Sequence, residues 1–300
     1  MLNKETIATE FMMLQDSICQ SLEEIDGSGR FKEDLWQREE GGGGRSRILE
    51  GGKLFEKAGV NFSKVFGNTP AFLYDTKQNI NPESQFFATG VSIVIHPINP
   101  WVPIIHMNIR YFEKDAGACW FGGGIDLTPH YVIPKDAIYF HGELRKVCNK
   151  HPLADYVKYK KEADDYFYIP HRNETRGIGG IFFDHLIPAD QTEKNVLFNF
   201  VLDVGKLFAP LYIEIVSRNK DRLYTSEEKK WQRIRRGRYV EFNLVYDRGT
   251  KFGLETNGRT ESILMSLPPQ ADWQYNFIPA TGTKESESLN FLKKGIDWLK

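Results

Sequence analysis

Three polar side chains able to do chemistry stand on alternate positions of one apolar stretch. In IIHMNIRYF, residues 104–112, they are His106, Asn108 and Arg110, and apolar residues separate them. A strand points alternate side chains to opposite faces, so one face here is apolar and the other carries an imidazole, an amide and a guanidinium. An imidazole exchanges protons near neutral pH, and a guanidinium binds carboxylates as a planar fork. The pattern therefore predicts a site on the polar face of this strand.

The preceding segment adds Ser92 and His96 to the same face. Three prolines confine the intervening turn to about residues 97–103, because proline cannot donate a hydrogen bond in a ladder. A turn centred near residue 101 pairs His96 with His106, and Ser92 with Arg110. Facing imidazoles at such a distance can share a metal ion or pass a proton through a ligand. The alternative is a solvent-exposed polar face of a half-buried sheet, on which Thr, Lys and Glu would be interchangeable.

Two further histidines stand in polar surroundings. Together with the pair above they form a candidate ligand set for a borderline metal: His96, His106, His141 and His171. Each of the added histidines alone also suits a surface or capping role, and the spacing matches no compact zinc motif. A divalent metal ion is therefore an open possibility.

Other motifs are weaker. The stretch EEGGGGRSRILEGG, residues 39–52, reads as a loop that could wrap an anion with its N–H groups and with Arg45 and Arg47, or as a flexible surface loop. The sequence has no GxGxxG after a strand, no GxxxxGK[ST] and no GxSxG, so no nucleotide or flavin fingerprint is present. The basic stretch KKWQRIRRGR fits a solvated helix face better than a nucleic-acid contact.

The elements that must position these groups indicate an α+β fold in a single domain, residues 1–300. Hydrophobic periodicity predicts helices near 4–25, 135–149, 152–167 and 192–218, a basic helix at 226–238 and a C-terminal helix near 289–299. Strands are predicted up to about residue 68 and near 85–96, 104–113 and 118–126. The segments YVEFNLVYD and TKFGLET are predicted to form a hairpin. Strands linked by hairpins before and after a block of helices favour an antiparallel sheet.

Composition narrows the class of protein. The net charge of −1 over 300 residues gives no global attraction to nucleic acid. No stretch of eighteen apolar residues, no signal peptide and no transit peptide is recognised, so we expect no membrane span and a cytoplasmic protein. Cys19, Cys119 and Cys148 are scattered and odd in number, which is typical of reduced thiols.

Long blocks of the chain resemble the oxygen-dependent coproporphyrinogen III oxidase family. They include WQREEGGGGRSRILEGGKLFEKAGVNFS, HPINPWVPIIHMNIRYF, WFGGGIDLTPHY, DDYFYIPHRNETRGIGGIFFD and GRYVEFNLVYDRGTKFGLETNGRTESILMSLPP. The resemblance covers about residues 5–299. It implies a large antiparallel sheet flanked by helices on both faces, assembled as a homodimer through about residues 239–274. It also implies oxidative decarboxylation of two propionates of coproporphyrinogen III to vinyl groups with O2, giving protoporphyrinogen IX in haem biosynthesis.

The resemblance also implies roles for particular residues. The proton donor of the family matches His106, and an acid proposed to hold the pyrrole nitrogens matches Asp247. The proposed metal ligands are the four histidines above. The substrate contacts match seven positions: Ser92, Asn108, Ile109, Arg110, Asn257, Gly258 and Arg259. Many relatives carry Gly at the position of Asn257 and Asp at that of His185, so His185 is left out of the predicted site.

No cofactor motif accompanies these residues, so the electron-rich pyrrole itself is expected to reduce O2. His106 is expected to transfer a proton rather than to ligate a metal, with His96 as its orienting partner. Two alternatives stay open. One is a metal enzyme of another class, which the four histidines support. The other is a tetrapyrrole carrier with the same pocket, which would bind porphyrinogen but release no CO2.

Overall fold

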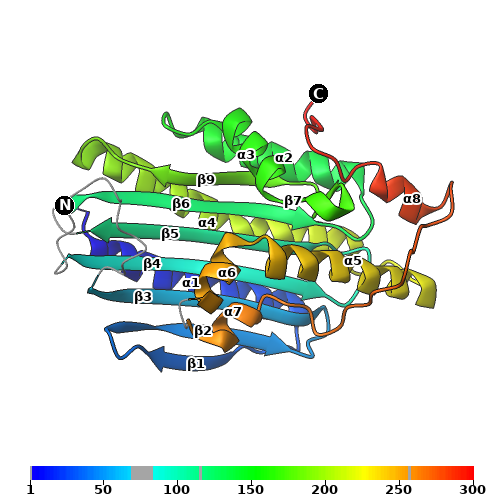
Figure 1. Cartoon of the computed structure of the whole chain (residues 1–300), viewed down its shortest axis with the longest axis horizontal. Coiled ribbons are helices and arrows are strands. Elements are labelled where there is room, and N and C mark those ends of the chain that lie inside the picture. Colours follow the sequence, from blue (N-terminus) through cyan, green and yellow to red (C-terminus); the bar gives the residue numbers. More distant parts are fainter. Residues whose placement is uncertain (1, 69–83, 115–116, 256–257) are drawn as a thin grey trace.

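The computed structural model describes residues 2–68, 84–114, 117–255 and 258–300. One antiparallel sheet dominates it, with the strand order β1-β2-β3-β4-β5-β6-β9 (Figure 1). Its strands are β1 (Lys32–Gln37), β2 (Gly42–Glu50), β3 (Phe55–Asn68), β4 (Gln85–Pro97), β5 (Ile104–Lys114), β6 (Cys119–Thr128) and β9 (Gly180–Leu186). The short strands β7 (Tyr168–Ile169) and β8 (Glu174–Thr175) pair separately.

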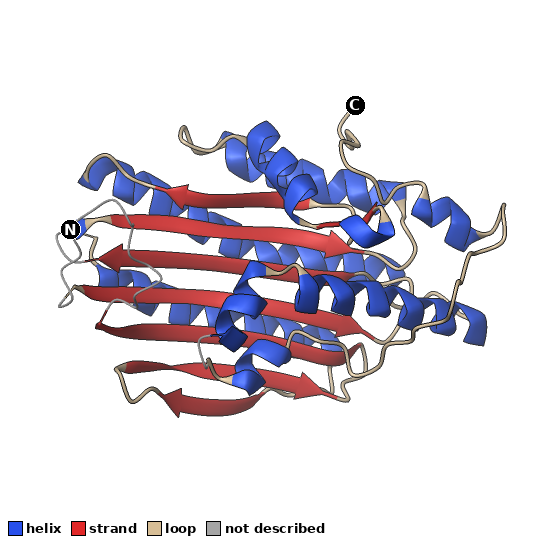
Figure 2. Ribbon diagram, in the orientation of Figure 1, coloured by secondary structure: helices blue, strands red, loops and turns tan. Residues whose placement is uncertain are grey.

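Helices cover both faces of this sheet, as Figure 2 shows. Three pack behind it in that view: α1 (Lys4–Asp26), α2 (Pro134–Asn149) and α4 (Gln191–Asn219). Helix α3 (Tyr156–Tyr166) packs along the edge strand β9. Three cross part of the front: α5 (Ser226–Val245), α6 (Arg248–Glu255) and α7 (Thr260–Leu264). A 3-10 turn (Pro170–Arg172) and α8 (Lys284–Leu289) complete the described elements. The predicted α+β class, with an antiparallel sheet between helices, is confirmed.

The main core lies between the back of the sheet and α1–α4. The side chains of Ile105, Met107 and Ile109 are fully buried there, as their alternation with polar residues predicts. Helix α1 adds a stripe of buried residues three or four positions apart, from Ile7 to Leu22. Asn3 caps this helix, because its side chain accepts a hydrogen bond from the Thr6 N–H at 2.9 Å. The helix predicted near residues 4–25 is therefore confirmed.

Helix α4 is long and apolar enough, by length and composition, to cross a membrane. It is the one helix of the described residues that passes this test, and 61% of its most apolar window is buried inside the protein. Its buried positions, which include Phe200, Val204 and Phe208, belong to the same core cluster as α1. In this fold it is a core helix.

The Gly-rich stretch is a strand and not a loop. β2 pairs with β3 along its whole length and with β1 from Gly43 to Ile48. Gly44 suits this position because a Cβ there would lie 2.2 Å from the Trp36 ring, which crosses it. Arg45 and Arg47 point to the α1 side, where each lies 2.7 Å from an oxygen of Asp16. Their guanidinium groups are therefore occupied by a carboxylate of the same chain.

The predicted hairpin at YVEFNLVYD and TKFGLET is wrong. Helix α5 continues to Val245, and α6 begins three residues later. A capping box starts α5: the Thr225 side chain accepts from the Glu228 N–H, and the Glu228 side chain accepts from the Thr225 N–H. The C-terminal helix predicted near residues 289–299 is also wrong. Helix α8 ends at Leu289, and turns follow it.

Candidate functional site

The polar face of β4 and β5 is the face that α5–α7 partly cover (Figure 1). His106, Asn108 and Arg110 are partly exposed on it, and Ser92 lies directly opposite Asn108. The register differs from the expected one by two residues, so that Val94, not His96, faces His106. A shift of two preserves the face of every side chain, and the predicted shared face is therefore confirmed.

His106 is oriented by a carboxylate from the neighbouring strand. β6 places Asp126 directly opposite His106, and His106 Nδ1 lies 2.8 Å from Asp126 Oδ1. The Asp126 side chain is buried, whereas His106 keeps a fifth of its side chain exposed. An imidazole held at Nδ1 by a carboxylate presents Nε2 for proton exchange. The expectation that His96 orients His106 is wrong, since His96 Nε2 bonds the Ser266 carbonyl oxygen at 2.9 Å.

Asp126 is in turn held by Arg176. The guanidinium donates to both carboxylate oxygens, at 2.7 and 2.8 Å, and to Asn243 Oδ1 at 2.8 Å. Burial by itself raises the pKa of Asp126, but the charge of Arg176 and the hydrogen bond from His106 outweigh it, so the pKa is lowered. Asp126 is therefore a carboxylate at neutral pH, ready to stabilise an imidazolium.

An aromatic cage surrounds Arg176. Its guanidinium carbon lies 4.4 Å from the ring centroid of Phe167, 4.7 Å from that of Tyr239 and 4.6 Å from that of Phe242. Such cation–π contacts help to hold a desolvated guanidinium. Helix α5 supplies two of the rings, so this helix fixes the group that fixes Asp126.

Sequence reasoning missed both Asp126 and Arg176. The signal for Asp126 was present, because it is the charged residue in the apolar strand WFGGGIDLT and shares the parity of two glycines. Arg176 carries no such signal, since it lies in a turn-rich segment with no periodicity. Only the fold shows that it reaches Asp126.

Asp247 lies at the start of α6, beside the same centre. Its side chain accepts from the Thr250 N–H at 2.7 Å and from the Tyr166 hydroxyl at 2.8 Å. Burial raises the pKa of Asp247, but these hydrogen bonds and the charge of His106 outweigh it, so the pKa is lowered. Asp247 is therefore ionised at neutral pH.

Arg110 is held in place by two neighbours. Its Nη1 donates to Asn108 Oδ1 at 3.1 Å, and its Nη2 lies 2.8 Å from Asp184 Oδ1. The Arg110 side chain is 39% exposed. A guanidinium has five N–H donors, so donors remain for a substrate carboxylate.

The residues that pair with Arg110 on both neighbouring strands are glycines. Gly90 of β4 and Gly122 of β6 lie opposite Arg110 on either side. A Cβ on Gly122 would come within 2.7 Å of Asp184 Oδ1 and 3.0 Å of Arg110 Nε. Glycine at this position therefore permits the ion pair between Arg110 and Asp184.

The other predicted substrate contacts do not converge on Arg110. Asn257 lies outside the described residues. Gly258 donates its N–H to the Gly253 carbonyl oxygen at 2.8 Å. Arg259 donates to Ser262 Oγ at 3.1 Å and bonds Asp34 of β1, the far edge strand from β9. The Ile109 side chain is fully buried on the helix-covered back face, so only its backbone can reach a substrate on the front.

The predicted four-histidine metal site is not assembled in the described part of the chain. No three or more His, Cys, Asp or Glu side chains there are placed to hold a metal ion together. Both ring nitrogens of His141 have protein partners: Nδ1 lies 3.0 Å from the Tyr156 hydroxyl and Nε2 3.0 Å from the Ile178 carbonyl oxygen. His96 is fully buried under α5. These residues do not fit one metal ion in a single chain, because they lie on separate elements with other partners.

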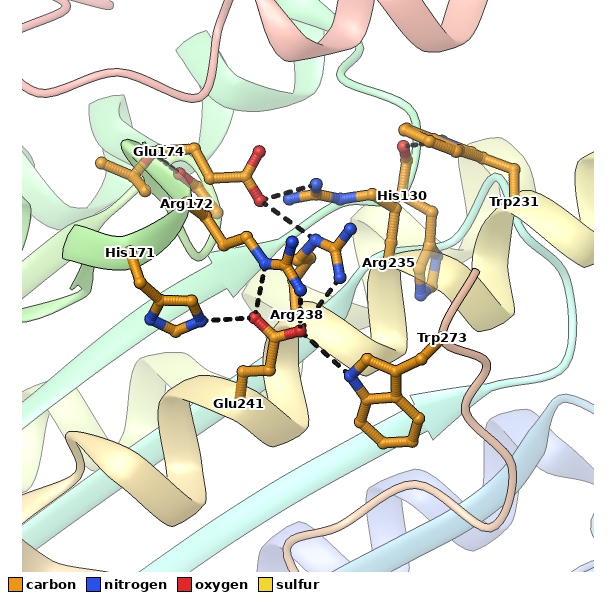
Figure 3. A network of polar contacts seen from close by, with 11 residues as sticks. His130, His171, Arg172, Glu174, Trp231, Arg235, Arg238, Glu241 and Trp273 are labelled. Atoms are coloured by element: carbon orange, nitrogen blue, oxygen red, sulfur yellow. Dashed lines mark hydrogen bonds and ion pairs between the residues drawn. The ribbon is translucent and has the colours of Figure 1, made fainter. Parts of the chain in front are cut away.

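His171 belongs to a different network, which Figure 3 shows around Glu241. Glu241 accepts from His171 Nε2 at 2.7 Å, from Arg172 at 2.7 and 2.8 Å, from Arg238 at 3.0 Å and from Trp273 Nε1 at 3.0 Å. Burial raises the pKa of Glu241, but Arg172 and His171 outweigh it and lower the pKa to about 2. This network ties α5 to the segments before β8 and after α7.

An imidazole on a buried carboxylate, a second carboxylate and a partly exposed guanidinium are the kinds of group that acid–base chemistry on an anionic substrate requires. Comparisons with known proteins identify the family. The model of the coproporphyrinogen III oxidase family matches residues 6–298. The chain is also 48% identical over 298 residues to coproporphyrinogen-III oxidase 1, chloroplastic, of Arabidopsis thaliana, with 95% of this chain and 76% of the relative covered. The chain belongs to the coproporphyrinogen III oxidase family and is an oxidoreductase.

Proposed function

We propose that the front face of the sheet oxidatively decarboxylates two propionates of coproporphyrinogen III to vinyl groups, giving protoporphyrinogen IX for haem biosynthesis. The observation that carries this proposal is the linked set of Arg176, Asp126 and His106 on the face that also presents Arg110. The guanidinium of Arg110, which can bind a carboxylate, and the imidazole of His106, which can exchange a proton, thus lie on one face of the sheet. Family membership supports the substrate and the reaction.

The chemistry assigns a task to each group. For each propionate, the carboxylate leaves as CO2 and the carbon next to the ring loses hydrogen, while O2 takes the two electrons and is released as H2O2. Arg110 binds a propionate, and His106, backed by Asp126, exchanges the proton that this conversion moves. Asp247 accepts the pyrrole N–H groups and increases the electron density of the ring. The pyrrole then reduces O2, and the proposal needs no flavin or metal ion as redox cofactor.

One assay tests the reaction. Coproporphyrinogen III is mixed with the protein without O2, and O2 is then admitted while CO2 and protoporphyrinogen are measured. We expect both products after O2 and neither before it. Binding of the porphyrinogen without CO2 release would instead identify a tetrapyrrole carrier.

The same assay tests the metal question. After treatment with a chelator, the protein is expected to keep most of its activity, because His106 acts through proton transfer. An inactive chelated protein whose activity returns with a divalent ion would overturn this assignment of His106 in favour of ligation.

We also propose a homodimer through about residues 239–274. The described part of this segment exposes large apolar side chains, among them Leu244, Val245, Leu254 and Trp273. Exposed apolar side chains gathered in one segment are typical of an interaction surface. The proposed location is the cytoplasm, on the ground that Cys19, Cys119 and Cys148 are free and buried, as in a reducing compartment.

A further inference from the structure

The ion pair between Arg110 and Asp184 poses a problem for binding an anion. Asp184 Oδ1 lies 2.8 Å from Arg110 Nη2 and also accepts the backbone N–H of His185 at 3.0 Å. Burial raises the pKa of Asp184, but the charge of Arg110 outweighs it and lowers the pKa. Asp184 is therefore ionised at neutral pH, and it neutralises the guanidinium that has to attract a substrate carboxylate.

A second group that can carry a positive charge, the imidazole of His185, lies beside the other oxygen of the Asp184 carboxylate. His185 Nδ1 lies 3.5 Å from Asp184 Oδ2. His185 adopts a φ of 51°, a left-handed conformation that is uncommon for residues other than glycine but enriched in His, Asn and Asp. Asp184 thus lies between the guanidinium of Arg110, which is always charged, and the imidazole of His185, which is charged only when protonated.

The His185 ring is held on the front face by stacking. Its centroid lies 5.3 Å from that of Trp120, with 13° between the ring planes. Trp120 stacks on Phe112 at 4.1 Å, and Phe112 on Phe86 at 5.8 Å. This ladder of rings crosses β4, β5 and β6 at the end of the sheet near Arg110. His185 is therefore positioned next to Arg110 although two thirds of its side chain is exposed.

Few other ionisable groups of the described residues act on this carboxylate. Strand β5 contributes Arg110, and the charges that shift the pKa of Asp184 are those of Arg110 and His185. Helix α3, which packs on β9, presents Tyr159 to Phe183 and Tyr166 to Phe182. Burial raises the pKa of both tyrosines to about 12, so they are neutral in the working range.

We propose that protonated His185 takes over the neutralisation of Asp184 and so leaves the charge of Arg110 available to a substrate propionate. His185 is then a positioning residue that makes substrate binding depend on pH. The inference rests on the proposed function, since it assumes that Arg110 binds a carboxylate of the porphyrinogen. One added unit charge several ångströms from that carboxylate, in a hydrated site, changes KM by about two- to sixfold.

Three proteins test the proposal: the wild type, His185→Asn and His185→Lys. Asn tolerates the left-handed backbone and cannot titrate, whereas Lys keeps a fixed positive charge. The KM for coproporphyrinogen III and kcat are measured from pH 6 to 8.5 at low and at high salt. We expect the wild-type KM to rise with pH, the Lys variant to keep a low KM and the Asn variant to keep a high KM throughout. High salt is expected to bring the three KM values together.

His151→Asn serves as the matched control. His151 forms another His–Asp pair, with Asp203 Oδ2 at 3.0 Å from its Nε2, but it lies at the end of α2. The KM of the His151→Asn variant is expected to follow the wild-type pH profile. The inference is overturned if the wild type, the Asn variant and the Lys variant share one KM profile while turning over substrate. If none of them turns over coproporphyrinogen III, the proposed function itself fails.

Discussion

At the scale of single residues, the charge of His106 helps to lower the pKa of two carboxylates that differ in their burial and partners. Asp126 is fully enclosed and bound by Arg176, whereas Asp247 caps a helix and is only half-buried. The pKa of each is lowered, so both are anionic while the imidazole exchanges its proton. Asp126 orients His106, whereas Asp247 is held by Tyr166 and Thr250 and not by His106.

The first prediction concerns the proton transfer by His106. His106→Asn keeps a hydrogen-bond donor beside Asp126 but removes the titrating ring. We expect the variant to bind coproporphyrinogen III and to turn over at least about 100-fold more slowly, as is typical when a general acid–base group is lost. Binding is measured by fluorescence quenching under anaerobic conditions, and turnover by product formation. Turnover within a few-fold of wild type would remove His106 from the mechanism.

The second prediction concerns the buried pair of Asp126 and Arg176. Asp126→Asn leaves the guanidinium buried without its counter-charge, which costs about 3–5 kcal/mol of the free energy of unfolding. Because the pKa of Asp126 is lower in the folded protein, its stabilisation is present above the unfolded pKa and is lost as pH falls through the folded pKa. Denaturant unfolding at pH 7 measures the cost.

The control for Asp126 is an ion pair at the surface. Asp165→Asn breaks the contacts of Asp165 with Lys161 and Lys294, in which all three side chains are at least 40% exposed. Such pairs contribute at most about 1 kcal/mol. Equal losses in the two variants would show that Arg176 is compensated by some other group.

At the scale of elements, the strands of the site could be predicted well and its partners poorly. The period of two in IIHMNIRYF placed His106 and Arg110 on one face, and a register error of two residues left that face unchanged. The partner of His106 was missed although its signal, a charged residue in an apolar strand, was present. Asp126 faces His106 through the pairing of β5 with β6, and alternation within each strand fixes the faces of the side chains but not this register.

For helix α5, by contrast, the type of element itself was predicted wrongly. Alternating apolar residues in YVEFNLVYD suggested a strand, yet Tyr239 and Phe242 are buried three positions apart and Leu244 is largely exposed. A period of 3.6 accounts for this burial, because the helix turns one side to the sheet and to Arg176. Short apolar runs fit both periods, and here the packing against Arg176 decides between them.

The third prediction concerns the network that fixes α5. Glu241→Gln keeps the size of the side chain but removes the charge that binds Arg172, Arg238 and His171. The pKa of Glu241 is about 2 in the folded protein, so its contribution is present above the unfolded pKa near 4.5 and is lost as pH falls towards 2. We expect the wild type to lose up to about 3 kcal/mol more stability over this range than the variant does.

Unfolding by urea between pH 5 and 2.5 measures this difference. The exposed Glu255 at the end of α6 provides the control, and Glu255→Gln is expected to keep the pH dependence of the wild type. Parallel curves for the wild type and Glu241→Gln would show that the network adds nothing to stability in acid.

At the scale of the whole molecule, the two helical layers serve different ends. Helices α1–α4 bury the apolar back of the sheet and make its strands rigid. Helices α5–α7 cross only part of the front (Figure 2), and α5 supplies the rings around Arg176. His106 and Arg110 are thus carried on a paired strand, which holds positions more accurately than a loop does. The segment of α5–α7 that fixes the site also carries the exposed apolar side chains of the proposed dimer.

The last prediction concerns this assembly. We expect the wild type to sediment as a dimer at micromolar concentration, and Val245→Glu to shift it towards the monomer. Half of the Val245 side chain is exposed at the end of α5, and a carboxylate there would be desolvated opposite its own copy. Leu223→Glu is the control, because Leu223 is 95% exposed outside the segment and its substitution should leave the dimer intact. A monomeric wild type would contradict the proposal, and dissociation by both substitutions would place the interface elsewhere. Since α5 also holds Arg176 and hence Asp126, the monomeric variant is expected to lose activity as well, and recovery of both at high protein concentration would link assembly to the site.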